Sequence, residues 1–263
     1  MDAVASPPSP PPLPPVAGRI AFALGIAAIG AQDVLGGEFV RGLQPVPGWV
    51  PARAALAVVT GAVLVTAGAA IAAGRGVRSA ARALTALLAV SLVCLHLPAL
   101  IGHPGNGGAW ASAFEIVALT GAAAVLALPA KPAVGRIGYG ITLPVFGVLH
   151  FVFREYTASV IPGWLPWPMF WALATGVAHI AGGAALVVDR RARLAASLLA
   201  VMFGTWVVIL HAPRVVAHPA QAEWTSLCVA LAMCGGAWLI AGLERPAVGH
   251  SPSARGPSPM QVS

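Results

Sequence analysis

Residues 54–74 read AALAVVTGAVLVTAGAAIAAG and contain no charged side chain. A helix needs about 20 mainly apolar residues to cross the hydrocarbon core of a bilayer, because each residue advances the helix by only about 1.5 Å. This stretch therefore predicts a transmembrane helix. Similar apolar runs recur along most of the chain, so they decide the fold class.

The composition excludes a soluble globular protein. Of 263 residues, 58% are apolar and only 9% are charged, whereas about 25% of residues are charged in a typical soluble domain. The formal net charge is +7, but the basic residues occur singly or in pairs at the ends of apolar runs, and they form no patch for nucleic acid. The sequence predicts an all-α integral membrane protein in contact with the lipid bilayer.

Eight candidate spans lie between the charged residues, and an even number places both chain ends on the same side of the membrane. The predicted transmembrane helices cover residues 20–40, 54–74, 83–101, 110–130, 137–153, 168–188, 194–213 and 224–243.

Positive charges are distributed unequally between the two sides. The side that carries the chain ends has eleven Lys and Arg residues, and the opposite side has four. Short cytoplasmic loops are enriched in Lys and Arg, so we expect both termini in the cytoplasm of a cell and the protein in its inner membrane. The eleven are Arg19, Arg75, Arg78, Arg82, Lys131, Arg136, Arg190, Arg191, Arg193, Arg245 and Arg255, and the four are Arg41, Arg53, Arg154 and Arg214.

The chain contains an internal duplication. At a shift of 117 residues, Arg19, Gly30 and Glu38 align with Arg136, Gly147 and Glu155. At a shift of 115 residues, Pro47-Gly48-Trp49-Val50-Pro51 aligns with Pro162-Gly163-Trp164-Leu165-Pro166. At this second shift, His96-Leu97-Pro98 also aligns with His211-Ala212-Pro213.

The duplication predicts the domain organisation. Residues 19–130 and 131–244 each form a four-span unit, and because four is even, both units enter the membrane the same way up, related by a pseudo-twofold axis along the membrane normal. Residues 1–18 are rich in proline, residues 245–263 are rich in Ser, Pro and Gly, and both are predicted to be disordered tails.

The second half carries Gly147-Val148-Leu149-His150-Phe151, the Pro-Gly-Trp-Leu-Pro loop, and a glycine pair at Gly182 ahead of a basic loop. With these motifs, each half resembles the DoxX-like family of four-span membrane proteins. The resemblance implies a membrane subunit of a quinone-linked oxidoreductase, with a quinone as the candidate cofactor and a membrane or soluble redox protein as the candidate partner. The chain departs from the family pattern at His179 and Leu64, where a Glu is often found ahead of the second-span glycine pair.

His96 and His211 are matched histidines, each two residues before a proline. Proline lacks an N–H, so the carbonyl four residues before it, that of Cys94 or Ile209, loses its helical donor. In one interpretation each imidazole donates to such orphan carbonyls. In the other, the two imidazoles face a common cleft between the halves, where they bind a quinone head group or relay protons.

His179 is the single residue that the sequence most clearly indicates as a candidate functional residue. It lies roughly 17 Å along its span from Pro168, near the middle of the bilayer. Gly176 and Gly183 share its helical face, and small residues mark the packed face of a membrane helix. We therefore expect His179 to point into the bundle, either as a catalytic group or as an interhelical hydrogen-bonding group.

The remaining candidates lie near the span ends opposite the termini. Asp33 aligns with His150, so the two could transfer a proton if the halves face one another, and the alternative is a solvated rim. Trp49 and Trp164 are expected to anchor the chain at headgroup depth, with quinone stacking as a second role. Glu115 has no acidic counterpart and is expected to reach the interface.

Three functions stay open at this point. The first is an auxiliary or quinone-interacting subunit of a membrane redox system, with its site between the halves. The second is a small-solute transporter or channel along the repeat interface, and the third is a structural or assembly protein. Neither a metal site nor a disulfide is predicted, because the ligand types lack the required spacing and all three cysteines lie in apolar runs.

Overall fold

The computed structural model describes residues 15–243, which are helical throughout apart from loops and turns. Eight helices of this part of the chain are long and apolar enough to cross a membrane. In chain order, the elements are α1 (Val16–Gly36), α2 (Arg53–Ala73), α3 (Val77–Ser91), η1 (Leu92–His96), α4 (Leu97–Gly102), α5 (Gly107–Ala127), α6 (Pro132–Val152), α7 (Arg154–Val160), α8 (Pro168–Val187), α9 (Ala192–Trp206), η2 (Val207–His211), α10 (Ala212–Ala217) and α11 (Gln221–Ala241).

The predicted number of apolar helices of membrane-spanning length is confirmed, but several predicted boundaries are wrong. Helix α3 begins at Val77 and not at residue 83, because Arg78 and Arg82 continue the helix. Long basic side chains can extend toward water from a helix that stays regular. Helix α1 ends at Gly36, where Gly37 adopts the left-handed conformation that terminates many helices. Helix α1 begins at Val16, within the stretch predicted as an N-terminal tail. Residues 1–14 of that tail and the predicted C-terminal tail, residues 245–263, lie outside the described residues.

The helix contacts form two five-membered rings that share α5 and α11. The first ring is α1, α2, α3, α5 and α11, and the second ring is α6, α8, α9, α11 and α5, with each helix packed against its two neighbours. Helix α1 therefore packs against α11 of the other half, and α6 packs against α5. Each ring takes helices from both halves of the sequence.

Glycines set the closest helix contacts. A Cβ added to Gly30 of α1 would lie 2.5 Å from the carbonyl oxygen of Gly61 in α2, and one added to Gly147 of α6 would lie 2.6 Å from the carbonyl oxygen of Gly176 in α8. Without a driving force from water, membrane helices associate through such close backbone packing. A larger residue at Gly30, Gly61 or Gly147 would force the pair apart.

The shared helices fill the centre of the protein. Ala118, Ala122, Ala232 and Ala237 of α5 and α11 are fully buried, and the hydroxyl of Tyr139 donates to the carbonyl of Met233 at 2.7 Å. The centre is consequently a packed core.

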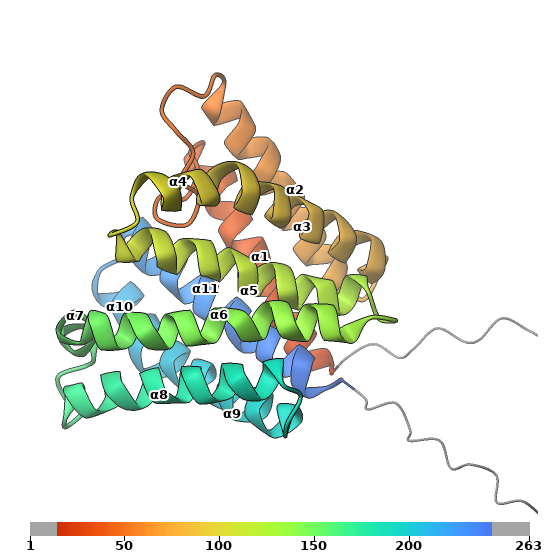
Figure 1. Ribbon diagram of the computed structural model, residues 1–263. Helices are drawn as coiled ribbons and strands as arrows, with labels where there is room; N and C mark the ends of the chain where they lie inside the picture. The colour runs from red at the N-terminus through yellow and green to blue at the C-terminus, as the bar shows by residue number, and fades with distance from the viewer. Residues whose placement is uncertain (1–14, 244–263) are drawn as a thin grey trace, which may run out of the picture.

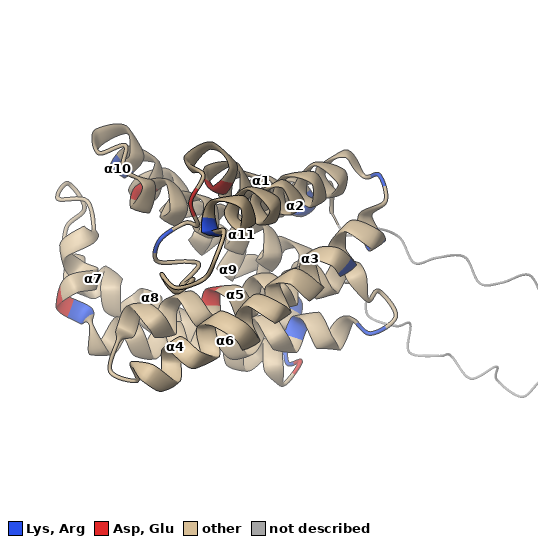
Figure 2. Cartoon of the chain, turned by 90° about the horizontal axis from the view of Figure 1, so that it is seen from above, with Lys and Arg blue, Asp and Glu red and all other residues tan. Residues whose placement is uncertain are grey.

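Both ends of the described chain lie at the same end of the bundle, where Pro15 packs against Gly242 (Figure 1). Figure 2 shows basic residues concentrated at this end and charges of both signs at the other. Of the described Lys and Arg residues, only Arg41, Arg53, Arg154 and Arg214 belong to the opposite end, which also carries Glu38, Glu155 and Glu223.

Candidate functional site

A cavity of about 370 Å³ lies within the second ring, and we call it the histidine cavity. This volume is at the lower end of the roughly 300–1,000 Å³ typical of small-molecule sites. Helices α5, α6, α7, α8, α9 and α11 and the turn η2 all contribute to its wall, so both halves of the chain build it. Its ionisable residues are Glu115, His150, Tyr156, His179 and His211.

His179 lies at the bottom of this cavity, with only 4% of the residue exposed, as its glycine face predicts. Its ring packs among Phe146, His150 and Phe203, with ring centroids 5.9, 5.0 and 5.5 Å away. Among the described residues, neither ring nitrogen has a partner with good hydrogen-bond geometry, although the backbone of Thr175, one turn earlier in α8, lies close enough to interact with the ring. A buried polar group without a well-formed hydrogen bond destabilises a protein by about 1–3 kcal/mol.

His150 presents an acceptor to the same space. A contact of 2.8 Å joins its Nδ1 to the carbonyl oxygen of Phe146, and since a carbonyl can only accept, Nδ1 carries the hydrogen. In the neutral ring, Nε2 is then an acceptor. His150 can sit beside His179 because Gly176 has no side chain there, and a Cβ on it would lie 3.0 Å from the His150 Cβ.

His211 enters the cavity from the π-helical turn η2, which ends at this residue. A π-turn adds one residue to the helical turn and re-aims the side chains that follow. Its buried Nδ1 has no partner, so the expected hydrogen bond to the carbonyl of Ile209 is not formed.

The position of Glu115 differs from the sequence prediction, which placed it at the membrane interface. Glu115 lies about 12 Å along α5 from Gly107, half-buried, and lines the cavity instead of reaching the interface. No hydrogen bond or ion pair links its carboxyl group to another described residue. Its counterpart Val229, at a shift of 114 residues, is apolar, and that asymmetry was the signal that could have identified it.

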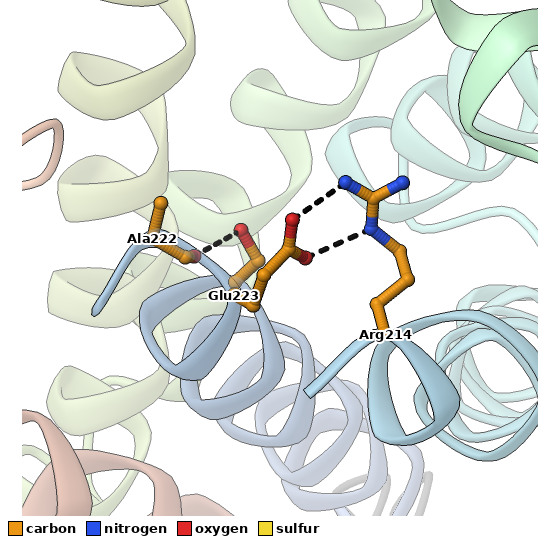
Figure 3. Close-up of polar contacts among 4 residues, drawn as sticks. Arg214, Ala222 and Glu223 are labelled. Atoms are coloured by element: carbon orange, nitrogen blue, oxygen red, sulfur yellow. Dashed lines mark hydrogen bonds and ion pairs between the residues drawn. The ribbon is translucent and has the colours of Figure 1, made fainter. Parts of the chain in front are cut away.

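An ion pair fixes the wall beside His211. Figure 3 shows the Arg214 guanidinium directed at the carboxylate of Glu223, with Nε donating to Oε2 at 2.8 Å and Nη2 donating to Oε1 at 2.6 Å. Arg214 lies one turn beyond His211, and Glu223 lies one turn before Ser226, another cavity residue. The pair therefore joins α10 to α11 at the end of the cavity.

His96 is not part of this site, so the predicted His96 and His211 pair in a common cleft is not formed. The His96 ring nitrogens contact the carbonyl oxygens of Ser91 at 3.0 Å and Leu43 at 2.9 Å, rather than that of Cys94. These contacts attach the loop after α1 to η1. His96 has a structural role in the first ring, whereas His211 lines the second.

Asp33 has a similar structural role. Its two carboxylate oxygens accept from the backbone N–H of Val40 and the side-chain amide of Gln44, both at 3.0 Å. No described contact links Asp33 to His150, so the predicted proton-transfer pair is not formed. The reason is that each first helix packs against the last helix of the other half, which keeps these aligned positions in separate rings.

The two loop tryptophans lie outside the histidine cavity. Trp49 and Trp164 are 80% and 68% exposed, which fits membrane anchors better than stacking platforms. The aromatic residues that do line the cavity include Trp171 and Trp206, which no sequence pattern predicts for this role.

The first ring holds a cavity of about 250 Å³ whose wall has no histidine or charged residue. Aligned wall positions differ systematically between the rings. Ile29 is replaced by Phe146, Leu64 by His179, Leu88 by Phe203 and Ser91 by Trp206. Of these two cavities, only the histidine cavity has His or Glu side chains in its wall.

Residues 139–240 match the family model of a domain of unknown function, DUF8561. The match runs from α6 into α11, the four spans of the second half. No curated protein and no solved structure matches the chain. Within residues 15–243, no group of three or more His, Cys, Asp or Glu side chains has a geometry that could hold a metal ion.

Proposed function

We propose that this protein binds the head group of a quinone in the histidine cavity and serves as the membrane subunit of a redox system. The observation that carries the proposal is the unpartnered imidazole of His179, buried beside His150. An intramembrane ionisable residue is a functional candidate by default. A ligand that supplied the missing hydrogen bonds would remove the energetic penalty of this arrangement.

The wall chemistry suits such a head group. A quinone carbonyl needs a donor, which the N–H groups of His179 and His211 supply, and a quinol hydroxyl needs an acceptor, which His150 Nε2 and Glu115 supply. Phe146 and Phe203 offer aromatic faces to a flat ring. When bound, a quinone supplies two-electron, two-proton redox chemistry, and the side chains named here hold and accept its protons.

We also propose that the two halves are tandem parallel copies, with both termini in the cytoplasm. The lengths of α3, η1 and α4 recur in α9, η2 and α10, and the helix contacts recur with the halves exchanged. The basic end that carries the chain ends would then be cytoplasmic. The histidine cavity would lie in the outer half of the membrane.

A transporter with its path along the repeat interface has less support. Such a path would run between α5 and α11, where the small side chains are fully buried against one another. A purely structural protein has no use for the unpartnered histidine. The geometry therefore favours ligand binding over both alternatives.

Tryptophan fluorescence of the protein in nanodiscs tests the proposal, because Trp171 and Trp206 line the cavity and quinones quench indole emission. We expect saturable quenching by ubiquinone-1, weakened about tenfold or more by His179→Leu or His211→Gln. His96→Gln is the matched control, since it changes the counterpart of His211 outside the cavity. Equal binding by all four proteins, or no saturable quenching of the wild type, would refute quinone binding at this site.

A further inference from the structure

A surface groove of about 620 Å³ runs between α8 and α9. We call it the α8–α9 groove. Small residues of α8 form one side, among them Ala174, Ala178 and Ala181, and Leu194 and Leu198 of α9 form the other. Ala181, Leu194 and Leu198 are exposed, so in a bilayer the groove opens toward the lipid chains.

The groove and the histidine cavity meet at one place. Trp171, Thr175 and Trp206 line both. From Trp171 to Ala185, the groove follows α8 for about 20 Å, and it ends beside Arg190 and Arg191. These three residues lie between the cavity and the groove, so a ligand with its head in the cavity would have to pass them to reach the groove.

The first half has larger residues at the aligned positions of α2. At the shift of 115 residues, Val59, Val63 and Thr66 stand where α8 has Ala174, Ala178 and Ala181. The smaller residues on α8 leave room along this helix, in the same half that carries the histidines. The coincidence of groove and histidines in one half links the two features.

We infer that the α8–α9 groove holds the isoprenoid tail of the ligand and that Trp171 and Trp206 flank the passage through which its head enters the cavity from the bilayer. This inference rests on the proposed function, because it assigns the tail of the same ligand. The groove suits this occupant in three respects: it is apolar, it opens to lipid, and it adjoins the head-group site. A tail already in hydrocarbon gains little hydrophobic free energy there, so the groove acts mainly by giving the tail a path.

The test compares two quinones with the same head in the nanodisc quenching assay. Ubiquinone-1 has a tail short enough to need no exit, whereas ubiquinone-4 has four isoprene units and needs one. Ala178→Phe and Ala181→Phe fill the groove, and Ala181 is lipid-exposed, so its substitution leaves the core intact. Val63→Phe and Thr66→Phe on α2 are the matched controls.

We expect the groove-filled variants to bind ubiquinone-1 like the wild type and ubiquinone-4 about tenfold or more weakly, while both α2 variants bind both quinones normally. Retained ubiquinone-1 binding also shows that a variant is folded. Unchanged ubiquinone-4 binding in Ala178→Phe and Ala181→Phe would overturn the groove assignment and leave the head-group site standing. Wild-type protein that binds neither quinone would overturn both proposals.

Discussion

His150 and His179 face one another across the contact between α6 and α8, with ring centroids 5.0 Å apart. Of the two, His150 has a well-formed hydrogen bond within the described residues, to the carbonyl of Phe146. Under the proposed function, these two neighbouring imidazoles, one anchored and one without a well-formed hydrogen bond, would receive a ligand that both donates and accepts.

His179→Leu should stabilise the protein while it removes ligand binding. The substitution eliminates a buried polar group without partners, and the aligned position of the first half already holds the buried Leu64. We expect the free energy of unfolding to rise by about 1–2 kcal/mol, measured by thermal or denaturant unfolding in detergent. A loss of stability of that size would mean that His179 has a structural hydrogen bond.

His96→Leu should have the opposite effect on stability. It leaves the carbonyls of Ser91 and Leu43 without their contacts, and we expect a loss of about 1–3 kcal/mol in the same assay. His211→Leu is the control, because His211 satisfies no described carbonyl, and its change should be small. Similar losses for both variants would contradict the separate roles assigned to these histidines.

Glu115 should react with dicyclohexylcarbodiimide, an apolar reagent that modifies protonated carboxyl groups in membranes. Its carboxyl lines the cavity without a partner, whereas Asp33 is 0% exposed and accepts two hydrogen bonds. Mass spectrometry should find the adduct on Glu115 but not on Asp33, and ubiquinone-1 should slow the reaction. Modification of Asp33 in preference to Glu115 would contradict the prediction that the accessible carboxyl group belongs to Glu115 in the histidine cavity.

Arg214→Ala should destabilise the end of the cavity by about 1–2 kcal/mol. That value lies between those of exposed and buried ion pairs, because the side chains of Arg214 and Glu223 are 37% and 16% exposed. Arg154→Ala is the control, since its contact with Glu155 is longer, 3.9 Å, and more exposed. Unfolding in detergent measures both, and equal effects would argue against a specific role for the Arg214 pair.

Cysteine labelling tests the orientation. In a Cys94→Ala background, which removes the exposed native thiol, cysteines placed at Gly48 or Gly163 should react with an impermeant maleimide in intact cells. Cysteines at Arg78 or Arg191 should react only after permeabilisation. The reverse pattern would move the histidine cavity to the cytoplasmic half of the membrane.

Much of the fold could be read directly from the chain. Apolar runs such as residues 54–74 predict spans, because in lipid a helix satisfies its own backbone hydrogen bonds. The burial of His179 followed from Gly176 and Gly183 on its face. The apolar composition of a segment and the helical spacing of its small residues are sufficient to predict a span and its buried face, since both depend on one helix and its surroundings.

The site itself depended on packing between helices distant in sequence. Alignment of the halves paired His96 with His211 and Asp33 with His150, yet α1 packs against α11 and α6 against α5, so aligned residues face different rings. His96 and Asp33 both bind the loop that follows α1. Glu115 of the first half lines the histidine cavity, which is formed mainly by the second half. A sequence alignment records which positions correspond, but only the helix contacts decide which side chains share a cavity.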